Sequence, residues 1–205
     1  MKDEYRKESP VIRFLNQLGD VMGMSMLWLV CSLPLITIGA STAGLYAVVM
    51  REEMDGVVKP FFKGFRSSFR KATAAEGIFL LIGGILLADL SWLRGMEAEW
   101  ASLLAALIRV LMALAAATAI YTFPLIAVFE QSLRQTLKNA LLIALSNLPT
   151  TLLLLAAHAI PVLLIVLNPD MFIRYALPVV TFLGAGLLAV LSGWRLKKVL
   201  AKYRV

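Results

Sequence analysis

The sequence predicts an all-α protein whose helices form a bundle that crosses a membrane several times. Of its 205 residues, 60% are hydrophobic, and the mean hydropathy is +0.82, whereas soluble domains are about 45–50% apolar. The apolar residues form long blocks, and the basic residues gather between these blocks and at both ends of the chain. Both features are typical of a polytopic membrane protein, because lipid is the solvent that such blocks require.

One integral membrane domain is expected over residues 1–205, because no polar stretch is long enough to fold separately. The net charge of +7 follows the loops between apolar blocks, so we expect no nucleic-acid partner. The first 20 residues mix acidic with basic side chains. They precede an apolar run that exceeds the roughly 7–15 residues of a signal-peptide core, so we expect this segment in the mature protein.

The first helices are predicted around residues 21–50, which carry no charge. Ser9 and Pro10 resemble an N-cap and a first helical residue. The turns that follow are amphipathic, as in a helix that begins at the membrane interface. Pro34 is expected to end or kink this helix because it lacks an N–H donor. A second helix over residues 38–54 then returns, with residues 32–44 as the turn near the outer face. Because this limb is short, part of it is expected to be re-entrant, which requires protein around the broken backbone.

A short interfacial amphipathic helix is predicted near residues 60–71, within the long polar interval 51–76. Phenylalanines occupy one face of this helix and basic residues the other. An alternative is a docking site for a calmodulin-like partner or an anionic lipid. The members of the two faces are Phe61, Phe62, Phe65 and Phe69, and Lys63, Arg66, Arg70 and Lys71.

Four further apolar blocks predict the remaining spans, at residues 77–92, 101–129, 140–167 and 175–194. Pro124 is expected to kink the second of these blocks, whereas Pro149 and Pro161 interrupt the third. The Asn-Pro-Asp sequence at 168–170 indicates a turn. The run ALAAATA at 113–119 offers a small-residue surface for close helix packing.

The basic residues predict the orientation of the helices. The 51–76 interval, the connector at 130–139 and the C-terminal tail hold thirteen of the 20 Lys and Arg residues, and four more precede residue 21. A hairpin at 21–50 places all of these on the cytoplasmic side, in accord with the positive-inside rule. We therefore prefer six membrane helices with both termini in the cytoplasm, or five if residues 21–50 form a single span.

Three segments resemble the YesL-like family of small bacterial integral membrane proteins. They are SLPLITIGA at 32–40, FPLIAVFE at 123–130 and LKNALLIALSNLP at 137–149, and the resemblance extends in order over essentially the whole chain. No activity is established for this family, and its members tend to occur in Gram-positive bacteria near genes for carbohydrate uptake and breakdown. The resemblance therefore implies a bacterial cell-membrane location and subunits of a sugar transport system as partners, but it implies no site residues.

Ionisable groups within apolar spans are functional candidates, because they are costly to place in lipid. Arg109 and Asp89 lie in adjacent spans, and we expect them to form an ion pair across a short loop. An arginine that extends outward to the interface is the alternative. As a functional site, the pair would serve an anion, a proton or a sugar.

His158 is the only histidine, and we expect it to bond a carbonyl freed by Pro161. Its alternative role is in proton transfer or in binding a sugar hydroxyl. Asn147 and its polar neighbours are expected to lie near Tyr121, either as a polar pocket or as hydrogen bonds between helices.

No enzymatic chemistry is predicted. The sequence lacks the phosphate-loop, dinucleotide-binding, zinc-protease and nucleophile-elbow motifs, and its only cysteine, Cys31, cannot form a disulfide within one chain. We expect no cofactor and no metal. We favour a non-enzymatic accessory or scaffold for carbohydrate uptake, and the alternative is a small-solute transporter or channel subunit; either could be a homo-oligomer. A membrane-embedded enzyme is the least favoured class, because no acid–base pair is visible in the sequence.

Overall fold

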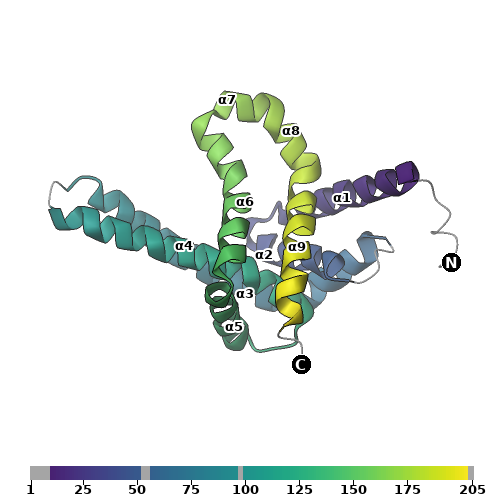
Figure 1. The fold of residues 1–205 in the computed structure, drawn as a ribbon, viewed down its shortest axis with the longest axis horizontal. Helices are drawn as coiled ribbons and strands as arrows, with labels where there is room; N and C mark the ends of the chain where they lie inside the picture. The colour runs from purple at the N-terminus through teal and green to yellow at the C-terminus, as the bar shows by residue number, and fades with distance from the viewer. Residues whose placement is uncertain (1–9, 52–55, 97–98, 203–205) are drawn as a thin grey trace.

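A computed structural model describes residues 10–51, 56–96 and 99–202, and these are helical with no strand among them. Figure 1 shows three limbs that diverge from a common centre: α1, the α3–α4 hairpin, and the arch from α6 to α9. The short helix α2 lies where the limbs meet. The all-α prediction is confirmed.

The principal helices follow the apolar blocks of the sequence. They are α1 (Pro10–Ser32), α2 (Ile38–Val49), α3 (Val58–Leu93), α4 (Glu99–Val128), α5 (Leu133–Ser146), α6 (Leu148–Leu167) and α9 (Ala185–Ala201). A short 3-10 turn, η2 (Leu35–Thr37), precedes α2, and the arch between α6 and α9 contains α7 (Pro169–Met171), η3 (Phe172–Ala176), α8 (Leu177–Val179) and η4 (Val180–Gly184). Both η3 and η4 have the π-helical hydrogen-bond pattern.

The helices α1 and α2 form the hairpin that Pro34 predicts. The indole Nε1 of Trp28 donates a 3.1 Å hydrogen bond to Thr42 Oγ1, and Val57 lies close to Gly23, so the chain returns alongside α1. The predicted turn was too long, because residues 38–44 are helical. The expected end at residue 54 lies outside the described residues, but α2 itself ends at Val49.

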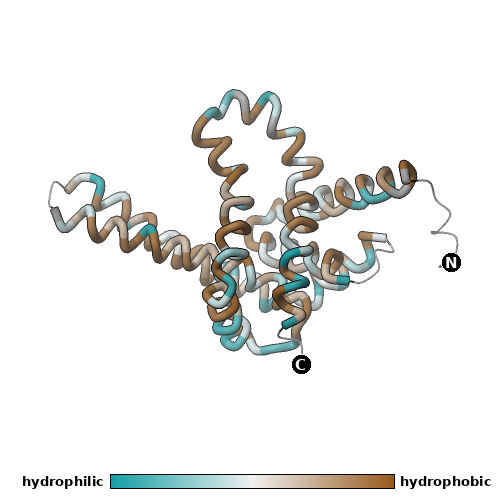
Figure 2. Tube along the Cα trace, viewed as in Figure 1, coloured by the Kyte–Doolittle hydropathy of each residue, from teal (hydrophilic) through white to brown (hydrophobic). Residues whose placement is uncertain are grey.

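Five helices in the described part of the chain are long and apolar enough to cross a bilayer, and α2 is not among them. Its 12 residues rise about 18 Å, whereas a hydrocarbon core is about 30 Å thick. The sixth membrane helix of the preferred model therefore does not cross by itself. Figure 2 shows apolar residues along the three limbs and polar residues at the turn of the α3–α4 hairpin, at the top of the arch and near the C-terminus.

The hub of the molecule is α2, since nine of its 12 residues are buried. A re-entrant segment in lipid requires such a cover of protein, because its terminal backbone groups lack partners. Gly44 permits close contact with α3, as a Cβ at this position would lie 3.0 Å from the Phe61 carbonyl oxygen. Gly193 permits a similarly close approach between α9 and Val49.

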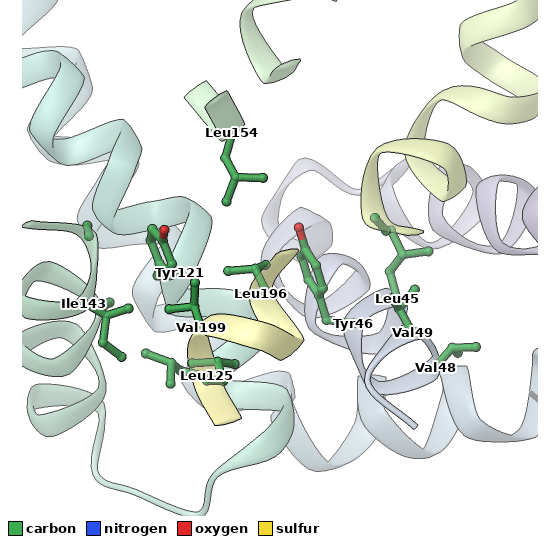
Figure 3. Packing of buried hydrophobic residues seen from close by; sticks show 14 of the residues in the cluster. Leu45, Tyr46, Val48, Val49, Tyr121, Leu125, Ile143, Leu154, Leu196 and Val199 are labelled. Carbon is green, nitrogen blue, oxygen red and sulfur yellow. The ribbon is translucent and has the colours of Figure 1, made fainter. Parts of the chain in front are cut away.

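The largest cluster of buried side chains surrounds this hub. Figure 3 shows Tyr46 of α2 and Tyr121 of α4 on either side of Leu196 from α9. The Tyr46 hydroxyl is hydrogen-bonded to Ser192 Oγ at 3.0 Å, and Ser25 Oγ accepts a 2.9 Å bond from the Gly186 N–H. These polar contacts fix α9 against α2 and α1.

The helix α3 differs from the prediction, because residues 60–71 do not form a separate interfacial helix. They are the first part of one continuous 36-residue helix. The proposed division into two faces holds only in part: Phe61 is fully buried, whereas Phe62 and Phe69 are exposed. Residues between 71 and 77 favour helix rather than a break, so the amphipathic segment continues directly into the apolar span.

The predicted block at 140–167 is divided between two helices. Asn147 ends α5, and Pro149 occupies the first turn of α6, where the missing N–H of a proline costs no hydrogen bond. Pro124 and Pro161 lie inside α4 and α6, respectively. The amphipathic α5 therefore forms a separate helix beside α4 rather than the beginning of a span.

Candidate functional site

The most unusual polar group in the described bundle is the Glu76 carboxylate. It lies midway along α3, and only 7% of the residue is exposed. Its Oε2 accepts a 2.9 Å hydrogen bond from the backbone N–H of Gly39, in the first turn of α2. The first N–H groups of a helix have no partner within the helix and carry partial positive charge, so a carboxylate is a favourable acceptor there.

Close packing between α2 and α3 places the Glu76 carboxylate beside the Gly39 N–H. A Cβ on Gly39 would lie 2.7 Å from the Ala72 carbonyl oxygen and 2.8 Å from Phe123 Cε1. Ala40, Ala43, Ala72 and Ala75 form a small buried cluster with Ile126 around the same contact. Small side chains on both helices thus bring α2 and α3 close enough for the bond to form.

Hydroxyl groups occupy both sides of this contact. Thr37 Oγ1 donates to the Pro34 carbonyl oxygen at 2.6 Å, and Ser41 Oγ donates to the Thr37 carbonyl oxygen at 2.8 Å. Among the described residues, the buried hydroxyls of Thr73 and Ser32 have no hydrogen-bond partner. Thr73 precedes Glu76 by three residues, which places both on the same side of α3.

The site can exchange a proton or bind a small cation through one carboxylate. Within the described ranges, no three side chains of His, Cys, Asp or Glu gather as a metal-binding group. Glu76 therefore offers a single charged ligand with backbone and hydroxyl groups nearby. This arrangement fits a site that joins helices or changes its protonation state.

Two predicted residues, Tyr121 and Asn147, do lie near each other, and Thr151 connects them. The hydroxyls of Tyr121 and Thr151 are 3.0 Å apart, and Thr151 Oγ1 also lies 3.0 Å from the Asn147 carbonyl oxygen. The Asn147 side chain donates to the Ile143 carbonyl oxygen at 3.0 Å. These bonds join α4 to the α5–α6 junction, so the helix-joining alternative fits this cluster better than an open pocket.

His158 does not meet the other candidates. Its Nδ1 lies 2.8 Å from the carbonyl oxygen of Leu154, one turn earlier in α6. The expected partner was a carbonyl freed by Pro161, and that carbonyl belongs to Ala157 because a helical N–H bonds four residues back. The expectation about its partner was therefore wrong.

Asp89 and Arg109 both lie exposed on the α3–α4 hairpin, and no ion pair joins them within the described part of the chain. The expected pairing was wrong for a reason of register: the core of the hairpin pairs Leu93 with Ala101, Ala105 and Ile108. Arg109 is followed by 20 uncharged residues, 110–129, which span about 30 Å as a helix. That length alone matches the thickness of the bilayer core.

Glu76 was missed because it ends the polar interval 51–76 and was grouped with the charges of a loop. The signal that could have found it was its isolation, since it is the only charged residue between Lys71 and Asp89. Its burial depends on Gly39, which lies 37 positions earlier. No local pattern indicates that partner.

The comparisons with known proteins bear on this same region. A family model described as "Protein of unknown function, DUF624" matches residues 21–90, a stretch that contains both Gly39 and Glu76. No curated protein and no solved structure matches the chain. The α1–α3 unit is thus the part of the chain that is similar to this uncharacterised family.

Proposed function

We propose that this protein is a non-enzymatic accessory or scaffold in a bacterial cell membrane, and that it associates with a carbohydrate uptake system. The observation that carries the proposal is the α3–α4 limb, which extends away from the hub (Figure 1). Its outer part is held together by its own small cluster around Leu93 and Ile108. Such a limb presents helix surface that the rest of the described chain does not cover.

The exposed surface of this limb is strongly apolar. Leu80 and Leu81 on α3 are each 65% exposed, and Leu103 on α4 is 75% exposed. Lipid covers such side chains in isolation, whereas a neighbouring transmembrane helix can cover them in a complex. We expect subunits of a permease to pack here.

The polar side chains of the bundle support the same function. Tyr46, Tyr121 and Trp28 each contact a hydroxyl on another helix. Of the five residues that the sequence singled out, Tyr121 and Asn147 are joined through Thr151, whereas Asp89 and Arg109 are exposed on the α3–α4 limb. A solute pathway requires such groups to converge on water, so their distribution favours a scaffold over a transporter. The link to carbohydrates rests on the YesL-like resemblance alone.

Photocrosslinking in native membranes tests this proposal. A photoreactive residue replaces Leu103 on the limb, and a matched variant carries it at Leu152, which is 63% exposed on α6. We expect Leu103 to crosslink to a sugar permease subunit and Leu152 to crosslink chiefly to lipid. Equal crosslinking at both positions, or crosslinking only between copies of the chain, contradicts the proposal.

A second candidate function, a small-solute transporter, is favoured by one observation, the buried Glu76 carboxylate beside the break between α1 and α2. Broken helices and intramembrane carboxylates occur at coupling sites of transporters. The test uses the purified protein in proteoliposomes that are loaded with a pH-sensitive dye. If the protein is a transporter coupled to protons, it should carry protons down an imposed pH gradient. A proton flux that the Glu76→Gln substitution abolishes would support the transporter function. A wild-type proton flux equal to that of empty vesicles would rule this function out.

A further inference from the structure

A pocket of about 470 Å³ opens where the end of α2 meets the beginning of α3. Its volume falls within the roughly 300–1,000 Å³ of small-molecule sites. No acidic side chain belongs to its described lining, which includes three cationic ones. The lining residues are Ala47, Arg51, Lys59, Pro60, Lys63, Gly64, Ser67 and Ala127.

The α3 side of the pocket is a single polar stripe. Lys59, Lys63 and Ser67 follow one another at intervals of four residues, so their side chains lie one above another on the helix. Gly64, between them in the lining, is buried against Gly44 and Ala47 of α2. The close contact of the two helices forms the floor, and the two ammonium groups and the hydroxyl form one wall.

Arg51 supplies the opposite side, at the end of α2. Its backbone carbonyl oxygen accepts a 2.8 Å hydrogen bond from Lys197 Nζ of α9. This contact ties the C-terminal helix to the rim and brings a fourth cation next to the pocket. Two cationic residues, Arg51 and Lys197, therefore meet where the end of α2 approaches α9.

The pocket lies at the depth expected for lipid headgroups. The basic residues of α3 are confined to its first part and end at Lys71, after which the helix becomes apolar and continues to Leu93. Phe62 and Phe69 are exposed on the same part of α3, so apolar side chains lie beside the basic ones, as in a helix at the membrane surface. A ligand in this pocket therefore lies beside the bilayer surface.

We propose that this pocket binds the phosphate headgroup of an anionic phospholipid, whose acyl chains extend along the apolar part of α3. Lys and Arg attract such lipids electrostatically, and basic pockets between membrane helices are known headgroup sites. Lys59, Lys63 and Arg51 neutralise the phosphate, whereas the Ser67 hydroxyl donates its hydrogen to the Gly64 carbonyl oxygen at 3.1 Å and adds only polarity to the lining. This inference is independent of the proposed scaffold function.

Native mass spectrometry of the full-length chain released from nanodiscs tests the proposal. The probe is phosphatidylglycerol, and phosphatidylcholine serves as the lipid without net charge. We expect the wild-type chain to retain phosphatidylglycerol preferentially. Lys63→Gln should weaken retention by about fivefold, and the triple variant Arg51→Gln, Lys59→Gln, Lys63→Gln by about 100-fold.

The matched control removes three exposed cations that do not line the pocket, in the variant Arg66→Gln, Arg70→Gln, Lys138→Gln. It should retain phosphatidylglycerol within about twofold of wild type, because none of these three cations lines the pocket. Equal losses in both triple variants would show a diffuse surface charge effect and overturn the proposal. If the triple variant does not fold, the single variants Lys63→Gln and Arg66→Gln are compared instead. Weaker phosphatidylglycerol retention in Lys63→Gln alone supports the pocket, and equal losses in both overturn the proposal.

Inorganic phosphate separates a lipid site from a site for a free phosphate compound. We expect about 10-fold more inorganic phosphate than lipid to leave the bound phosphatidylglycerol unchanged, because free phosphate lacks acyl chains that bury apolar area along α3. Displacement by phosphate at equal concentration would overturn the lipid proposal.

Discussion

The Gly39 N–H donates a 2.9 Å hydrogen bond to Glu76 Oε2, and this bond joins the first turn of the 12-residue α2 to the middle of the 36-residue α3. It meets two requirements at once. An exposed N–H at the start of α2 would be costly in lipid, and so would a carboxylate without a partner. The Glu76 carboxylate supplies the acceptor for the Gly39 N–H, and the N–H supplies a donor for the carboxylate. The folding of the α1–α2 hairpin and its packing against α3 therefore depend on each other.

Gly39→Ala should destabilise the protein by about 1–3 kcal/mol, the usual cost of overpacking a close contact. The added methyl meets backbone at the Ala72 carbonyl oxygen, which cannot rotate away. Gly77→Ala is the matched control, because no atom lies within 4 Å of its new Cβ and alanine favours helix by about 1 kcal/mol. Thermal unfolding in detergent measures both, and equal stability of the two variants would contradict the packing described here.

Two substitutions at Glu76 separate its hydrogen bond from its charge. Glu76→Gln keeps an oxygen acceptor for the Gly39 N–H, so we expect it to cost less than about 1 kcal/mol. Glu76→Ala leaves that N–H unpaired and should cost about 1–3 kcal/mol. Unfolding titrations in mixed micelles measure the difference. A glutamine variant as unstable as the alanine variant would mean that the charge, rather than the acceptor, matters.

The contact between Tyr121 and Thr151 should give a measurable coupling energy. The variants Tyr121→Phe and Thr151→Val remove the hydroxyls and nearly preserve volume, so each breaks the 3.0 Å contact between α4 and α6. Hydrogen bonds between membrane helices average about 0.6 kcal/mol in double-mutant cycles. We expect a coupling of about that size from the two single variants and the double variant. Strict additivity would show that the two hydroxyls do not interact.

Much of the fold could be predicted because its signals are local. Pro34 indicates the break between α1 and α2, and the uncharged run 110–129 gives the length of a span. These signals depend only on neighbouring residues and on bilayer thickness. The extent of α3 was harder to predict, because residues 60–71 have the two faces of an interfacial helix although residues 71–77 favour a helix that continues into the span.

The candidate site was harder to predict, because it depends on residues far apart in the sequence. Gly39 and Glu76 become partners only when α2 packs between α3 and the other helices. Asp89 and Arg109 were expected to pair because they flank a short loop, but the register of the hairpin is set by Leu93 and the small residues of α4. Proximity along the chain was therefore a poor guide to pairing.

The final prediction concerns the orientation of the helices, which the basic residues predict and cysteine labelling can test. In a Cys31→Ser background, single cysteines replace Gly95 at the hairpin turn, Asp170 in the arch, and the exposed Arg66 and Arg134. We expect an impermeant maleimide to label the first two in intact cells. The other two should react only after lysis, because basic loops remain in the cytoplasm.

Each outcome of this labelling identifies a different part of the topology. Reactivity of Arg66→Cys and Gly95→Cys from the same side would mean that α3 does not cross the membrane, despite its 36 residues. Inverted reactivity at all four positions would place the basic pocket at Lys59 and Lys63 on the outer surface. The predicted pattern requires α3, α4 and α6 each to cross once, since each separates two labelled positions of opposite reactivity.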